Sequence, residues 1–209
     1  MLWQLDPKLF DDNVENWSYL SQAFTKEECE KIIALGTSIA GGPAKVSSPT
    51  GKKSAENEEE GEDEGVLQLS ERISNVSWIT PTEESEWIFR RLTDVVQGAN
   101  SNFYNFDLWG FTEGLQFTKY EAPDGNYTAH IDKCLHKNTR KLSLVIQLSD
   151  PKDYEGGELK IIFSKEPLVT EREQGRATVF PSYTLHQVDP VTKGERYSLV
   201  AWITGPNFR

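Results

Sequence analysis

Residues 127–132 read YTAHID, and residues 180–188 read FPSYTLHQV. Residues two apart in a β-strand share a face, so His130 and Asp132 point to one side while Ile131 points away. The second run is also strand-like and carries His186. Because the chain has only three histidines, these positions predict a mononuclear metal site of His130, Asp132 and His186. The alternative for so short a motif is a surface histidine beside an aspartate in a turn.

Short strand-like runs separated by turn residues dominate the chain after residue 100. Turn signals support this pattern, notably PDG at residues 123–125 and KG at residues 193–194. So many short strands predict a mainly β sandwich or jelly roll with flanking helices. The predicted strands are residues 105–109, 115–121, 127–132, 141–148, 158–163, 177–180, 184–188 and 196–204.

Two helices are predicted before these strands. For the first helix, Thr25 and Glu28 have capping-box spacing, and Gly36 is the predicted C-terminal stop. The second helix follows Thr82 and presents one buried stripe. We therefore expect a helical N-terminal support at residues 1–99, integrated with a β core at residues 100–209. The stripe consists of Ile88, Leu92, Val95, Val96 and Ala99.

Charge and composition narrow the class of protein. The 209 residues carry a net charge of −11, which argues against binding to a nucleic-acid backbone. Residues 56–64 hold seven acids, within a stretch at 41–65 that has almost no apolar side chains. This stretch is predicted to be a solvated loop, with a lid or a recognition element for basic substrates as the alternatives. Two cysteines, no membrane-spanning run and no signal peptide predict a soluble cytoplasmic protein.

Two imidazoles and one carboxylate leave coordination positions open, an arrangement typical of non-haem Fe(II) oxygenases. Arg196 follows His186 by ten residues, and an antiparallel register pairing Asp189 with Arg196 would place it about 10 Å from the metal ligand. A five-carbon 2-oxo dicarboxylate fits that span, because Arg binds carboxylates with a bidentate fork. The alternative is a surface ion pair of Arg196 with Glu195 or Asp189.

The C-terminal half resembles the 2-oxoglutarate and Fe(II)-dependent oxygenases, specifically the prolyl 4-hydroxylase-like group of bacterial and phage type. The resemblance covers about residues 100–204, and the sequence around residues 78–82 resembles the N-terminal support of such proteins. It implies a double-stranded β-helix that uses Fe(II), 2-oxoglutarate and O₂, with ascorbate as a reductant. The matching pieces are QFTKY at 116–120, YTAHID at 127–132, RKLS at 140–143, GGEL at 156–159, FPS at 180–182, HQV at 186–188 and RYSLVAW at 196–202.

By the same resemblance, His130, Asp132 and His186 are the iron ligands and Arg196 anchors 2-oxoglutarate. Gln147 stands where several prolyl hydroxylases present a second tyrosine to the co-substrate, a departure that bears on co-substrate affinity. Tyr127 has the opposite strand parity to His130, and His136 is interpreted as a surface histidine. The further residues implied for the co-substrate are Tyr120, Gln147, Leu159 and Val188, and those implied for the substrate entrance are Arg140, Tyr127 and Trp202.

These features predict a 2-oxoglutarate-dependent dioxygenase that hydroxylates a prolyl residue in a peptide or protein and releases succinate and CO₂. Hydroxylation of another residue or of a small molecule remains an alternative. A zinc hydrolase using the same three ligands and a non-catalytic metal-dependent binding module are alternatives from other classes. We expect a monomer or homodimer in the cytoplasm, which is the host cytoplasm if the source is a phage.

Overall fold

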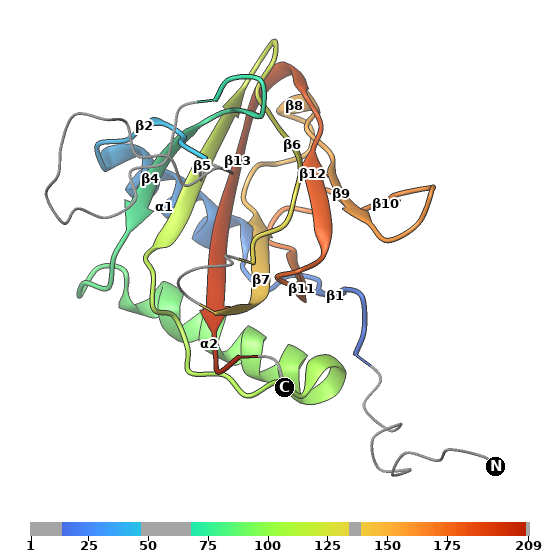
Figure 1. Cartoon of the computed structure of the whole chain (residues 1–209). Helices are drawn as coiled ribbons and strands as arrows, with labels where there is room; N and C mark the ends of the chain where they lie inside the picture. Colours follow the sequence, from blue (N-terminus) through green and yellow to red (C-terminus); the bar gives the residue numbers. More distant parts are fainter. Residues whose placement is uncertain (1–13, 47–67, 134–138, 208–209) are drawn as a thin grey trace, which may run out of the picture.

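The computed structural model describes residues 14–46, 68–133 and 139–207, which form two facing β-sheets with helices on one side (Figure 1). The 8-stranded sheet has the order β1-β11-β7-β13-β5-β4-β2, with β8 pairing to β13. The 5-stranded sheet has the order β10-β9-β12-β6-β3. The fold is thus mainly β, as predicted, and the two sheets form a double-stranded β-helix.

The core strands agree with the prediction to within a few residues, apart from β13, which begins five residues earlier. The smaller strands β1, β2, β3, β4, β8 and β10 were not predicted. Four of them precede residue 80 and extend both sheets with N-terminal sequence. The strands are β1 Ser18–Leu20, β2 Gly42–Pro43, β3 Arg72–Ile73, β4 Asn75–Ile79, β5 Leu115–Glu121, β6 Asn126–His130, β7 Arg140–Gln147, β8 Tyr154–Gly156, β9 Leu159–Ile162, β10 Leu168–Val169, β11 Ala177–Pro181, β12 Leu185–Val188 and β13 Val191–Thr204.

The two faces of the larger sheet are both apolar, but they pack against different parts of the protein. On β7, residues of even number such as Leu144 and Ile146 pack against the helices. The odd-numbered Val145 belongs to a second cluster between the two sheets, as do Phe180 and Tyr120. Strand alternation therefore assigns one face of this sheet to the helices and the other to the interior, where the candidate site lies.

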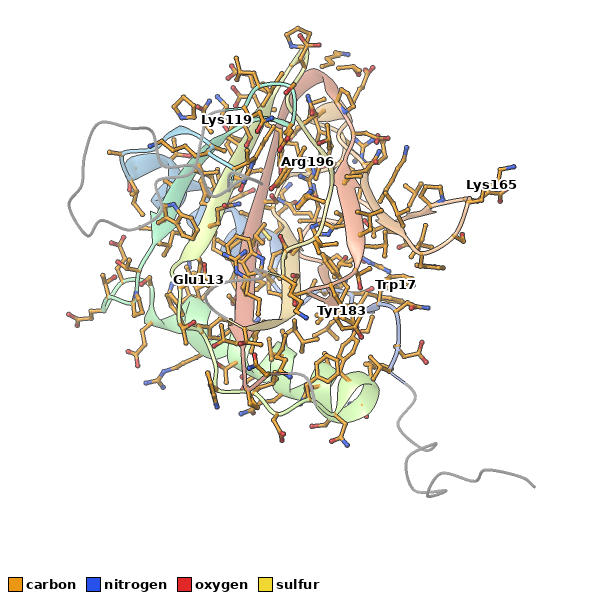
Figure 2. All side chains as sticks on the ribbon, in the orientation of Figure 1. Trp17, Glu113, Lys119, Lys165, Tyr183 and Arg196 are labelled. Carbon is orange, nitrogen blue, oxygen red and sulfur yellow. The ribbon has the colours of Figure 1, made fainter. Side chains whose placement is uncertain are left out.

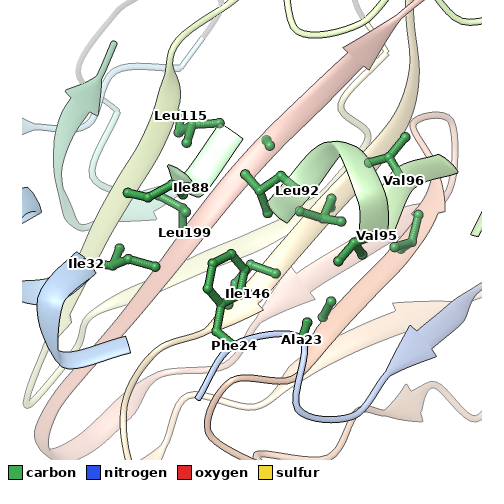
Figure 3. Packing of buried hydrophobic residues seen from close by; sticks show 14 of the residues in the cluster. Ala23, Phe24, Ile32, Ile88, Leu92, Val95, Val96, Leu115, Ile146 and Leu199 are labelled. Atoms are coloured by element: carbon green, nitrogen blue, oxygen red, sulfur yellow. The ribbon is translucent and has the colours of Figure 1, made fainter. Parts of the chain in front are cut away.

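The helix-side cluster is shown in Figure 3, where Ile32, Leu92 and Leu199 come together from a helix, a second helix and a strand. Helix α1 spans Lys26–Ser38, α2 spans Glu86–Ala99, and a π-helical turn, η2, continues over Asn100–Tyr104. The predicted stripe of α2 is buried at Ile88, Leu92, Val95 and Val96. Burial of each such side chain contributes roughly 1.5–3 kcal/mol, so this stripe fixes α2 on the sheet.

Helix α1 begins as predicted but ends later. Both hydrogen bonds of the Thr25–Glu28 capping box are present. Gly36 does not stop the helix, which runs on to Ser38. Instead Gly36 lets helix α1 pack closely against the sheet, since a Cβ atom at this position would lie 2.3 Å from the Phe117 ring. The Gly36 carbonyl also accepts a hydrogen bond of 2.7 Å from Ser77 Oγ.

The predicted strand at 105–109 is wrong. The amide side chain of Asn100 bonds both the N–H and the C=O of Phe106, each at 2.9 Å, and so takes the place of a neighbouring strand. Asn105 adopts a left-handed backbone conformation with φ of 50°, which ends η2 and is incompatible with a strand.

Two turn predictions also need correction. The PDG turn at 123–125 joins β5 to β6, which lie in different sheets, so it is not a hairpin. Lys193 and Gly194 lie inside β13, where they pair with β8. Because β12 and β13 also belong to different sheets, the predicted pairing of Asp189 with Arg196 is wrong. Strand order between sheets depends on long-range pairing that local turn signals do not report.

Among residues 14–46, 68–133 and 139–207, no helix has the length and apolar character that a membrane crossing requires. Most of the predicted acidic loop at 41–65, together with Cys134 and His136, lies outside the described residues. The proposed boundary between residues 99 and 100 remains a prediction.

Candidate metal centre and adjoining pocket

The structure brings His130, Asp132 and His186 together, with one ligand atom from each lying within 4.8 Å of the others. His130 ends β6 and pairs directly with His186 on β12. Asp132 follows two residues later, with its Oδ1 atom 3.7 Å from His130 Nε2 and its Oδ2 atom 3.5 Å from His186 Nε2. A neighbouring strand therefore supplies the third side chain, as the spacing predicted.

Hydrogen bonds behind the three side chains orient them toward a common point. His130 Nδ1 lies 2.7 Å from the Thr128 carbonyl, and His186 Nδ1 lies 3.0 Å from the Thr184 carbonyl. A carbonyl only accepts, so each Nδ1 carries the proton and each Nε2 keeps its lone pair for a metal. Ser143 Oγ donates to Asp132 Oδ2 at 2.7 Å, which fixes the carboxylate.

The charge states suit a divalent metal. Burial, reinforced by the neighbouring His186, lowers the pKa of His130 to about 4, so its imidazole is neutral near pH 7. Burial by itself would raise the pKa of Asp132, but the two imidazoles and the Ser143 hydroxyl outweigh it and hold this pKa below its usual value. Two imidazoles and one carboxylate are the donor set expected of a non-haem Fe(II) site.

Tyr127 joins the site because β6 contains a bulge. His130 pairs with His186 and Tyr127 pairs with Val188, so three steps along β6 match two steps along β12. The extra residue reverses the parity, and the Tyr127 and His130 rings stack with centroids 3.4 Å apart. The opposite parity inferred for Tyr127 from the sequence is therefore wrong, since it assumed a regular strand.

Arg196 is a buried cation in the interior, on the inner face of β13 (Figure 2). Its side chain is 2% exposed, and its Nε and Nη1 atoms have no hydrogen-bond partner among the described residues. The alternative ion pairs do not form, because Glu195 pairs with Lys119 at 2.6 Å and Asp189 with Lys160 at 2.5 Å. Such a guanidinium is suited to bind a carboxylate.

A pocket adjoins Arg196. Its lining includes Gln147 and Leu159, two of the residues predicted for the co-substrate. Val188 pairs with Leu159 across β12 and β9, and the Tyr120 ring lies 5.3 Å from the Arg196 guanidinium. The complete lining is Val145, Gln147, Gly157, Leu159, Thr170, Glu171, Arg172, Thr178 and Arg196.

Comparison with known proteins agrees with this geometry. A family model described as the 2OG-Fe(II) oxygenase superfamily matches residues 115–204, which contain the metal-site side chains and Arg196. Residues 115–204 are therefore similar to this superfamily. The oxygenase core therefore implies Fe(II) and 2-oxoglutarate, and both fit: the three donor atoms suit Fe(II), and the unpartnered guanidinium suits a carboxylate of 2-oxoglutarate.

Curated relatives of this oxygenase core are named PKHD-type hydroxylases. One from Colwellia psychrerythraea is 33% identical over 136 residues, covering 62% of this chain and 59% of the relative. One from Prochlorococcus marinus is 40% identical over 91 residues, covering 43% of this chain and 41% of the relative. The chain thus spans about half the length of these relatives.

Solved structures share the fold at low sequence identity. A Pseudomonas putida prolyl-4-hydroxylase superposes with a TM-score of 0.64 at 21% identity, covering 91% of this chain and 93% of that one. A Trichoplax adhaerens prolyl hydroxylase in complex with a hypoxia inducible factor peptide fragment superposes with a TM-score of 0.69 at 15% identity, covering 95% of this chain and 86% of that one.

Arg140 and Trp202, predicted at the substrate entrance, lie together beside the metal site. The guanidinium of Arg140 is 3.8 Å from the Trp202 ring centroid, and its Nη1 donates to the Asp132 carbonyl at 3.3 Å. Glu113 holds Arg140 through two bonds of 2.8 and 2.5 Å. The Trp78 ring lies 6.1 Å from Trp202 and is partly exposed.

Sequence reasoning did not identify three residues of this region. Glu113 precedes β5 in a segment without periodicity, so no pattern indicated its bond to Arg140. Tyr154 lies in the three-residue strand β8, and its hydroxyl accepts a hydrogen bond from Gln147 Nε2 at 2.8 Å. Ser143 was part of a quoted motif, but its contact with Asp132 depends on the pairing of distant strands.

Proposed function

We propose that the chain is a 2-oxoglutarate- and Fe(II)-dependent dioxygenase that hydroxylates a prolyl residue in a peptide or protein. The observation that carries the proposal is the presence of two features on the two facing sheets. Three ligand atoms converge within 4.8 Å, and a buried Arg196 with two unpartnered nitrogens lies on the inner face of the facing sheet. A zinc hydrolase would use the first feature but has no evident use for the second.

His130, Asp132 and His186 would hold Fe(II), and Arg196 would hold the distal carboxylate of 2-oxoglutarate. When bound, Fe(II), 2-oxoglutarate and O₂ supply an oxidative decarboxylation that yields succinate, CO₂ and a hydroxylated substrate. The chain's own contribution is positional. The Nδ1 hydrogen bonds fix the imidazoles, Ser143 fixes the carboxylate, and the apolar cluster around Tyr120 and Phe180 limits the access of water.

The entrance supports a prolyl substrate. Glu113 balances the charge of Arg140, whose guanidinium covers the buried Trp202 ring. The neighbouring Trp78 ring is exposed, so this surface offers an aromatic face near a fixed guanidinium. An aromatic face packs well against an uncharged ring, while the guanidinium can donate to a peptide carbonyl. The named activities of the structural neighbours from Pseudomonas putida and Trichoplax adhaerens agree with this choice. Ascorbate as reductant, a cytoplasmic location and a monomer or homodimer complete the proposal.

The test is incubation of the purified chain with Fe(II), 2-oxoglutarate, ascorbate and a library of proline-containing peptides in air. We expect succinate to form and one oxygen atom to be added to a proline, located by fragment mass spectrometry. Matched peptides with alanine in place of that proline, and an Asp132→Ala variant, serve as controls. Oxygen addition at another residue would refute the prolyl assignment, and hydrolysis without succinate would refute the oxygenase.

A further inference from the structure

Tyr154 is buried, and the proposed function gives it no role. We infer that its hydroxyl is a second donor to the distal carboxylate of 2-oxoglutarate, acting beside Arg196 and oriented by Gln147. This inference rests on the proposed function, because it concerns how the same site binds its co-substrate. Three observations carry it: the hydrogen bond of the hydroxyl, its place beside Arg196, and the rigidity of the ring.

The Tyr154 hydroxyl has an unused proton. The residue is 2% exposed, and its oxygen accepts a hydrogen bond from Gln147 Nε2 at 2.8 Å. Among the described residues this is the one hydrogen bond that the hydroxyl makes. A phenol that accepts one bond still has its O–H to donate, and a buried donor without an acceptor is costly. The hydroxyl therefore requires an acceptor that a bound molecule can supply.

Gly157 places this hydroxyl-bearing ring next to Arg196. A Cβ atom at Gly157 would lie 2.9 Å from Arg196 Cδ and 3.4 Å from Tyr154 Cε2, so the glycine occupies the narrow space between the two side chains. Gly157 also adopts a φ of +69°, which disfavours other residues there. Both Gly157 and Arg196 line the pocket, as does Gln147. The Tyr154 ring therefore lies next to residues that line this pocket, and its hydroxyl bonds one of them, Gln147.

The ring of Tyr154 is held in place before any ligand binds. The Arg172 guanidinium lies 4.1 Å from the ring centroid, and its Nη2 atom donates to the Tyr154 carbonyl at 2.7 Å. Gln147 fixes the other end of the side chain. A donor fixed in this way loses little entropy when it binds a ligand.

This arrangement also explains Gln147. The side chain is too short and lacks the ring to replace a tyrosine on β7, but its amide can direct a phenol that arrives from β8. Arg196 offers the unpartnered Nη1 and Tyr154 one hydroxyl, and the two oxygens of a carboxylate can accept both. The chain therefore supplies the second phenol from another strand.

The test compares two 2-oxo acids on wild-type protein and a Tyr154→Phe variant, which keeps the ring and removes the hydroxyl. The ligands are 2-oxoglutarate and 2-oxopentanoate, which has the same chain length but a methyl group in place of the distal carboxylate. Anaerobic titration of the Fe(II)-loaded protein, followed by the charge-transfer absorbance of the chelate, gives each Kd. We expect the Kd for 2-oxoglutarate to rise about 10-fold, roughly 1.4 kcal/mol, and the Kd for 2-oxopentanoate to stay unchanged.

The matched control is Tyr104→Phe. Tyr104 is also buried, and its hydroxyl bonds Ser18 and the Val179 carbonyl, but it belongs to the helix-side cluster. This variant should lose some stability while both Kd values stay at the wild-type level. Equal weakening of both 2-oxo acids by Tyr154→Phe would show a merely structural role and overturn the inference, as would no change for either. If wild-type protein binds neither acid, the proposed function fails as well.

Discussion

Replacing Arg196 by methionine should stabilise the protein in the absence of 2-oxoglutarate and remove its response to that ligand. Arg196 is 2% exposed, and two of its three nitrogens have no partner among the described residues. Burying a charged group without compensating bonds is unfavourable, and replacing buried ions by apolar side chains of similar volume often gains 1–4 kcal/mol. Taking a gain of about 1–2 kcal/mol, the Tm of a chain of this size should rise by roughly 2–8 °C.

Bound 2-oxoglutarate should make the wild type more stable than the Arg196→Met variant. At a 2-oxoglutarate concentration of about 100 times Kd, the wild type gains roughly 2.7 kcal/mol by mass action, whereas the Arg196→Met variant gains much less. Thermal unfolding of the metal-loaded protein with and without 2-oxoglutarate measures both effects. Arg196→Lys, which keeps the charge and loses the planar fork, is the control and should show neither the stability gain nor the full ligand response. A methionine variant that melts several degrees below wild type without ligand would refute the reasoning, because Arg196 would then be a structural residue.

Three other substitutions or reactions test separate parts of the structure. Ser143→Ala removes the hydrogen bond to Asp132, so Fe(II) should bind about 10-fold more weakly in an anaerobic titration, and an unchanged Kd would contradict the positioning role. Gly36→Ala should lower the free energy of unfolding by about 1–3 kcal/mol in urea despite the better helix propensity of alanine, because its Cβ would meet the Phe117 ring at 2.3 Å. Burial raises the pKa of Cys29 to about 12, so its thiol stays protonated near neutral pH, and a thiol reagent should label Cys29 only in denaturant; rapid labelling of Cys29 in the native protein, located by peptide mass spectrometry, would be inconsistent with this core.

The sequence predicted those elements that depend on interactions between residues close together in the chain. The Thr25–Glu28 capping box and the apolar stripe of α2 involve residues within one or two helical turns, and both form as expected. The convergence of His130 and Asp132 also followed from spacing, because only one residue separates them. The strand at Leu115–Glu121 was predicted with its exact bounds.

Features that depend on distant pairing were missed or mistaken. His186 and Arg196 are ten residues apart, yet their strands belong to different sheets. The antiparallel pairing predicted from their closeness in sequence was therefore wrong. One extra residue in β6 brought Tyr127 into the site, and nothing in an alternating pattern reveals such a bulge. The partnership of Gln147 with Tyr154 joins β7 to β8, which do not pair with each other, so sequence spacing could not predict it.

The central claim is that His130, Asp132 and His186 form an Fe(II) site that consumes 2-oxoglutarate. Succinate release in air, measured by NMR with Fe(II) and then with Zn(II), tests this claim most directly. We predict succinate from the wild type with Fe(II), and none with Zn(II), without O₂ or from Asp132→Ala. Succinate at the wild-type rate from Asp132→Ala would place the metal site elsewhere, and substrate cleavage with Zn(II) in the absence of succinate would contradict the oxygenase account.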